Sequence, residues 1–113
     1  MYSLIRDNLP ELLKQSKQQL NYAAIVNDEF FILALKQKMI EDVNSFLTSK
    51  EIIDIDALVN IQTLIDSLVA LSVEEKQFKK ACEDKAEKEG TYSKRYVAVF
   101  DEIQKEEKSP EAE

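Results

Sequence analysis

Residues 27–50, NDEFFILALKQKMIEDVNSFLTSK, form a long amphipathic stretch and decide the fold class of the chain. Apolar residues recur in this stretch at intervals of three and four, which is the period of an α-helix. Asn27 or Asp28 can cap its first turn, and Glu29 complements the positive end of the helix dipole. Because the apolar stripe is wide, the sequence predicts that this helix packs on more than one neighbour.

Three further helices are predicted on either side of this stretch. A short helix spans residues 7–15, with Asp7 as its cap and Pro10 in its first turn, where a missing N–H is harmless. A third helix begins near Asp54 or Asp56 and runs to residue 71, and a fourth runs from residue 72 to 89. Gly90 ends the fourth helix, as glycine commonly does.

The composition favours an all-α fold. The chain has 113 residues, the size of one domain, with only one Gly and two Pro, so its turns are few and its elements are long. We expect a helical domain over residues 1–100 and an acidic, disordered tail over residues 101–113. Residues 22–26 and 96–100 read as extended chain that can pair as a small two-stranded ribbon.

Charge and cysteine content exclude several classes of function. The net charge of −7 argues against nucleic acid or an anionic membrane surface as a partner. The chain has no His and a single Cys, Cys82, which excludes a disulfide framework and an ordinary zinc site. No apolar run approaches the roughly 20 residues that span a bilayer, and the N-terminus lacks a signal-peptide pattern. We therefore expect a cytoplasmic protein.

Two adjacent acids, Glu41 and Asp42, lie in the middle of residues 27–50 and partly on the face that should be buried. Carboxylates are costly to bury unless a cation or a hydrogen-bond donor meets them. The pair therefore indicates a metal or phosphate site. The alternative is that both acids are solvated at the edge of the apolar stripe.

Four segments occur in a characteristic order: LIRDNLPE at 4–11, KMIEDVNSF at 38–46, ALVNI and LIDSL at 57–61 and 64–68, and GTYSKR at 90–95. Together they make residues 2–100 resemble the all-α nucleoside triphosphate pyrophosphohydrolases of the MazG and phosphoribosyl-ATP pyrophosphohydrolase superfamily. The resemblance implies a four-helix MazG-like bundle. It also implies a hydrolase in which carboxylates from two antiparallel helices hold Mg²⁺.

The resemblance places the four metal ligands at Asp42, Ser45, Ala57 and Asn60, with Glu41 beside them. Only Asp42 keeps a carboxylate, so Mg²⁺ should bind weakly and hydrolysis should be weak or lost. Glu41 and Asp42 are the catalytic candidates. In an alternative, an active enzyme uses a shifted metal set of Glu41, Asp42 and Asp56, assisted by Asn60.

The resemblance also implies that Arg6, Lys38 and Arg95 bind phosphate. We therefore expect a MazG-like protein that still binds a nucleotide or another phosphate compound. A further alternative is a non-catalytic helical interaction module. Because the second and third helices carry more apolar surface than a monomer of this length covers, we expect a homodimer or a larger assembly.

Overall fold

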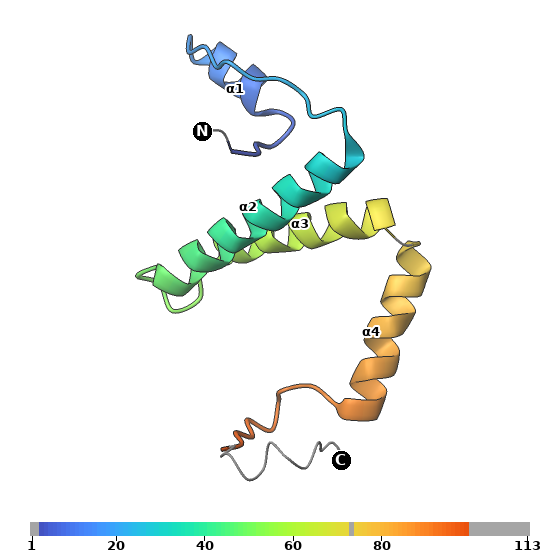
Figure 1. Ribbon diagram of the computed structural model, residues 1–113. Helices are drawn as coiled ribbons and strands as arrows, with labels where there is room; N and C mark the ends of the chain where they lie inside the picture. The colour runs from blue at the N-terminus through green and yellow to red at the C-terminus, as the bar shows by residue number, and fades with distance from the viewer. Residues whose placement is uncertain (1–2, 73, 100–113) are drawn as a thin grey trace. The chain divides into compact units, whose positions relative to one another are not determined.

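The computed structural model describes residues 3–72 and 74–99 and is all-α in that part of the chain (Figure 1). Four helices follow one another in the described residues: α1 (Leu9–Gln15), α2 (Asp28–Thr48), α3 (Ile55–Ser72) and α4 (Glu75–Glu89). Their bounds differ by at most a few residues from those that the sequence predicts. The all-α class is thereby confirmed.

The chain divides into two compact units, Met1–Phe78 and Lys79–Glu113. The first unit contains α1, α2 and α3, and the second contains most of α4 and the segment after it. The predicted tail at residues 101–113 lies outside the described residues. The predicted helical domain over residues 1–100 therefore stays a prediction.

A hairpin of two helices is the packed part of the first unit. Helices α2 and α3 pack against each other, and they run in opposite directions from the loop that joins them (Figure 1). In this unit α1 packs on neither of them. The four-helix bundle that the resemblance implies is thus not shown, although its two expected metal-binding helices do lie side by side. The buried residues of the hairpin are Leu35 and Asp42 of α2 and Ala57, Leu64 and Val69 of α3.

Side chains at the helix starts explain where α2 and α3 begin. Oδ1 of Asn27 accepts a hydrogen bond of 3.0 Å from the Phe30 N–H, and Oδ1 of Asp54 accepts one of 3.1 Å from the Ala57 N–H. Each bond satisfies a backbone donor that a helix leaves free in its first turn. Asn27 rather than Asp28 therefore caps α2, and Asp54 rather than Asp56 caps α3.

The predicted cap of α1 is wrong, and the predicted end of α4 at Gly90 is confirmed. The residue that precedes α1 is Asn8 rather than Asp7, and it makes no side-chain capping bond. Gly90 ends α4 with a φ of 85°, which a residue without a Cβ adopts without strain. The Gly90 N–H donates to the carbonyl oxygen of Ala86 at 2.8 Å, which closes the last turn.

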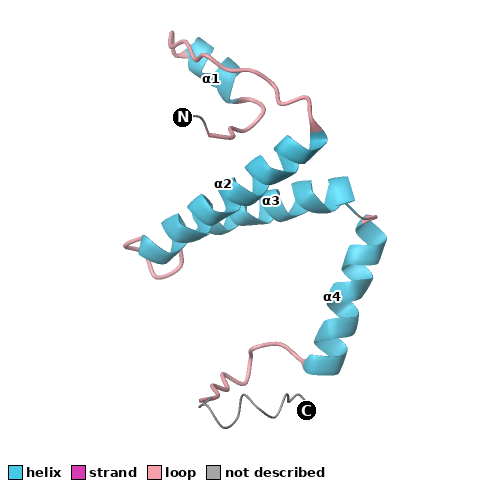
Figure 2. Cartoon of the chain, in the orientation of Figure 1, coloured by secondary structure: helices cyan, strands magenta, loops and turns pink. Residues whose placement is uncertain are grey.

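The predicted two-stranded ribbon is wrong. Neither residues 22–26 nor residues 96–99 form a strand, and Figure 2 draws both segments as loop; Phe100 lies outside the described residues. Both segments are exposed along their whole described length. A single pair of strands is marginal in water unless it buries an apolar face, and the apolar side chains of both segments are exposed.

No single helix within residues 3–72 and 74–99 has the length and apolar character to cross a membrane. Ile55–Leu71 and Glu75–Glu89 reach that length and apolar character only together, as a bent pair.

Candidate functional site

The segment before α1 connects both helices of the hairpin through polar side chains. The Nη2 atom of Arg6 donates to Oδ1 of Asn60 at 2.8 Å and to Oγ1 of Thr63 at 3.1 Å, both on α3. Three residues earlier, Oγ of Ser3 donates a long hydrogen bond of 3.5 Å to Oε1 of Glu41 on α2. Residues 3–6 therefore lie across the same face of α2 and α3.

On α2 the helical period brings three charged residues together. Lys38, Glu41 and Asp42 occupy positions i, i+3 and i+4, which are neighbours on a helix surface. Nζ of Lys38 lies 3.4 Å from Oε1 of Glu41 and 3.8 Å from Oδ1 of Asp42. With the contacts of the N-terminal segment they form one polar cluster. We define the polar cluster as Ser3, Arg6, Lys38, Glu41, Asp42, Asn60 and Thr63.

Asp42 is the buried acid of this cluster. Its side chain is 12% exposed, against 55% for Glu41, and it lies seven residues after Leu35 on the buried stripe of α2. The Lys38 ammonium lies near its carboxylate but beyond hydrogen-bond distance, so the ion pair is loose. A leucine at this position would continue the stripe. The aspartate thus departs from the packing pattern of its helix.

Arg6 differs from Lys38 in the kind of partner that holds it. Both of its hydrogen bonds go to neutral oxygens and both use Nη2. No ion pair joins Arg6 to an acid within the part of the chain that the structure describes. The guanidinium is therefore held in place while its charge, together with Nη1 and Nε, can still meet an anion.

The four positions that the resemblance gives to metal ligands lie on the two packed helices. Asp42 and Ser45 are three residues apart on α2, and Ala57 and Asn60 are three apart on α3. Ser45 is exposed, Ala57 is buried at 6% exposure, and Asn60 already accepts from Arg6. One carboxylate beside a lysine does not fit a Mg²⁺ site, because this cation needs anionic oxygens to replace its waters.

The shifted set of acids gains no support from the described geometry. Asp56 lies exposed in the first turn of α3, whereas Asp42 is buried and Glu41 is paired with Lys38. Among residues 3–72 and 74–99, no three His, Cys, Asp or Glu residues are grouped so that they could hold a metal ion.

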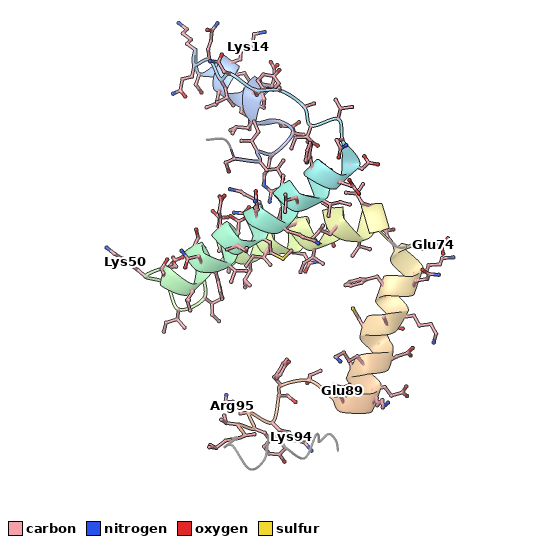
Figure 3. All side chains as sticks on the ribbon, viewed as in Figure 1. Lys14, Lys50, Glu74, Glu89, Lys94 and Arg95 are labelled. Atoms are coloured by element: carbon pink, nitrogen blue, oxygen red, sulfur yellow. The ribbon has the colours of Figure 1, made fainter. Side chains whose placement is uncertain are left out.

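Arg95 lies in the second unit, in the loop after α4, where Figure 3 labels it beside Lys94. Its φ of 61° is left-handed, and its N–H donates to the carbonyl oxygen of Tyr92 at 3.0 Å. Nζ of Lys94 lies 5.9 Å from the centre of the Tyr96 ring, which is a cation–π contact. The structure thus brings Arg6 and Lys38 into one cluster and leaves Arg95 in a separate unit.

Ser3 and Thr63 are the two cluster residues that the sequence did not single out. The signal that could have found Thr63 is its position three residues after Asn60 on a mostly apolar helix, because i and i+3 share a face. Its hydroxyl also donates to the carbonyl oxygen of Val59 at 2.9 Å, which fixes the oxygen that Arg6 contacts.

Comparisons with known proteins give no relative for this chain. No protein-family model, no curated protein and no solved structure matches it.

Proposed function

We propose that this chain binds a phosphate-containing small molecule, such as a nucleotide, at the polar cluster, and has little or no Mg²⁺-dependent hydrolytic activity. The proposal combines the resemblance to the MazG-like pyrophosphohydrolases with one geometric observation. That observation is the Arg6 guanidinium, held by the neutral oxygens of Asn60 and Thr63 rather than by an acid.

The charges of the cluster define what it can bind. Lys38 already faces Glu41 and Asp42, so its charge is largely compensated. Arg6 supplies a cation with free donors in a fork that matches two phosphate oxygens. A terminal phosphate at Arg6 would lie on the same face as Ser3, whose hydroxyl could donate to a phosphate oxygen only by giving up its long hydrogen bond to Glu41.

Weak or absent hydrolysis follows from the ligand set. Of Asp42, Ser45, Ala57 and Asn60 only Asp42 offers a carboxylate, and Mg²⁺ keeps its water shell when so little negative charge replaces it. Without a bound metal, the charge of a triphosphate is not neutralised and no metal-activated water is generated.

Calorimetry with nucleoside mono-, di- and triphosphates, in Mg²⁺ and in a chelator, tests the binding. We expect binding that survives the chelator and weakens about tenfold or more in Arg6→Ala, because a hydrogen bond to a charged group contributes about 1.5–3 kcal/mol. Lys14→Ala, which removes an exposed cation from α1, is the matched control and should bind as the native chain does. Equal affinity of Arg6→Ala and the native chain would overturn the proposal.

Pyrophosphate release under the same conditions separates this proposal from the active-enzyme alternative. Turnover that requires Mg²⁺ and disappears in Asp56→Ala would support the shifted acids Glu41, Asp42 and Asp56.

The third alternative, an interaction module, is favoured by a separate observation. Large apolar side chains of the hairpin remain exposed, among them Ile40, Leu47 and Ile55. Such a surface marks a site of association with another protein.

A further inference from the structure

The polar cluster holds as many acids as cations. Its cations are Arg6 and Lys38, and its acids are Glu41 and Asp42. Nζ of Lys38 lies 3.4 Å from Oε1 of Glu41 and 3.8 Å from Oδ1 of Asp42, so both carboxylates share this one ammonium. Arg6 makes no ion pair with any residue that the structure describes. The cluster therefore offers an anion one uncompensated positive charge.

A further acid lies close to the Arg6 contacts on α3. Asp56 precedes Asn60 by four residues, which puts the two on the same helix face and about 6 Å apart along the axis. Asp56 is exposed, and it makes no ion pair within residues 3–72 and 74–99. Its negative charge is therefore directed at solvent one turn away from the residue that holds Arg6.

Glu41 is the corresponding acid on α2. Its side chain is 55% exposed, and it accepts from Ser3, three residues before Arg6 in the chain. Three residues of chain reach at most about 10 Å, so Glu41 lies near the same contacts from the neighbouring helix. Carboxylates thus lie near Arg6 in two directions, along α3 and across the hairpin.

This distribution of charge favours a small anion over a large one. A phosphate monoester carries a charge of about −1.5 to −2 at pH 7, and one guanidinium fork can hold two of its oxygens. A triphosphate adds two more negative groups, and along the hairpin these approach Glu41 or Asp56. Like charges closer than about 8 Å repel each other with only partial screening at physiological salt. The net charge of −7 acts in the same direction.

We propose that the polar cluster binds a phosphate monoester, of a nucleoside or of another small molecule, in preference to a triphosphate. This inference rests on the proposed function and deepens it, because it names the class of phosphate compound. Arg6 holds the phosphate, and Glu41 and Asp56 set the preference by repelling a longer phosphate chain. The resemblance implies a triphosphate instead, so the preference comes from the charges of this chain's own residues.

Calorimetry with AMP, ribose 5-phosphate and ATP measures the preference, in a chelator so that ATP keeps its full charge. We expect both monoesters to bind about fivefold more tightly than ATP, because a contact between exposed charges changes affinity by up to about fivefold. ATP that binds as tightly as AMP would overturn this inference and leave the proposed function intact. Absence of binding by all three compounds would overturn both.

Charge-neutral variants test whether the two acids set the preference. Glu41→Gln with Asp56→Asn removes two charges at nearly constant shape, and it should bring ATP to within about twofold of AMP. The matched control, Asp28→Asn with Glu29→Gln, removes two charges in the first turn of α2 and should leave the preference unchanged. Glu29 lies 12 residues before Glu41, about 18 Å along the axis and beyond the screening distance. Equal effects of the two double variants would overturn the inference.

Salt gives an independent measurement on the native chain. The preference for AMP over ATP should shrink as KCl rises from about 0.1 M to about 1 M, because the Debye length falls from about 10 Å to about 3 Å. A preference that stays constant over this range would mean that shape rather than repulsion sets it, and would overturn the inference.

Discussion

The Nη2 atom of Arg6 donates a hydrogen bond of 2.8 Å to Oδ1 of Asn60, which lies 54 residues later in the chain. This bond, with the one to Thr63, fastens the segment before α1 to the hairpin, although α1 itself packs on neither helix. The same contact orients the guanidinium that carries the proposed phosphate site. We therefore expect the proposed phosphate binding and the position of the N-terminal segment to be coupled through this one side chain.

Removal of the Arg6 side chain should loosen the N-terminal segment at a modest cost in stability. Arg6→Ala breaks two exposed hydrogen bonds, and we expect a loss of about 1 kcal/mol in the free energy of unfolding. Urea titration gives the loss, and proteolysis before α1 should become faster. Lys17→Ala, in the exposed chain after α1, should change neither. An Arg6→Ala protein as resistant to proteolysis as the native chain would contradict the tether.

The caps of α2 and α3 give a second prediction. Asn27→Ala and Asp54→Ala each remove a side-chain acceptor for a first-turn N–H, so each should destabilise the hairpin by about 1 kcal/mol. Asn27→Asp keeps an acceptor and should retain most of the stability. Urea midpoints at a constant m value are the measurement. A similar loss in Asp28→Ala as in Asn27→Ala would mean that the cap is misassigned.

Helix bounds were predictable because local signals set them. Three such signals are visible in the sequence, and each acts over one helical turn. They are the cap Asn27 before α2, the cap Asp54 before α3 and the left-handed Gly90 after α4. The ribbon was not predictable in the same way, because an extended segment becomes a strand only where a partner and a buried face exist.

The polar cluster required tertiary contacts that no local pattern encodes. Arg6 and Lys38 were each proposed for phosphate, yet the contact of Arg6 with Thr63 spans 57 residues and could not be read from spacing. Asp42 was placed partly on the buried face by the helical period alone, and it is buried. Arg95 shows what local patterns cannot predict, because its place in the second unit depends on chain packing rather than on its motif.

Asp42 gives a prediction about folding stability. Its side chain is only 12% exposed and lies on an apolar stripe, and the loose ion pair with Lys38 returns little of the cost of desolvation. We therefore expect Asp42→Leu to raise the free energy of unfolding by about 1–2 kcal/mol. Glu41→Leu, at the exposed neighbouring acid, should change it by less than about 0.5 kcal/mol.

The urea midpoint of Asp42→Leu decides this prediction. A lower midpoint than that of the native chain would mean that the carboxylate makes a net stabilising contribution. A higher midpoint would mean that the aspartate is kept for a reason other than folding stability.

Restoring the lost carboxylates tests the mapping of the metal positions. Ala57 is 6% exposed, so Ala57→Glu alone should destabilise the chain by about 3 kcal/mol, because it leaves a buried charge without a partner. In the triple variant, which also carries Ser45→Glu and Asn60→Asp, the new carboxylate at position 57 would join that of Asp42 around a cation. Mg²⁺ should then stabilise the triple variant, by about 2.7 kcal/mol at a hundred times the dissociation constant, and should leave the single variant unchanged.

Thermal unfolding with and without Mg²⁺ measures this difference, and calorimetry gives the affinity of the triple variant directly. A matched control moves one acid off the shared face: Asn44→Glu replaces Ser45→Glu in the triple variant. One residue along α2 turns the side chain by about 100°, so the control should gain no Mg²⁺ affinity. Equal Mg²⁺ stabilisation of both triple variants would reflect general screening of acidic charge, and the assignment of Asp42, Ala57 and Asn60 to a former metal site would fail.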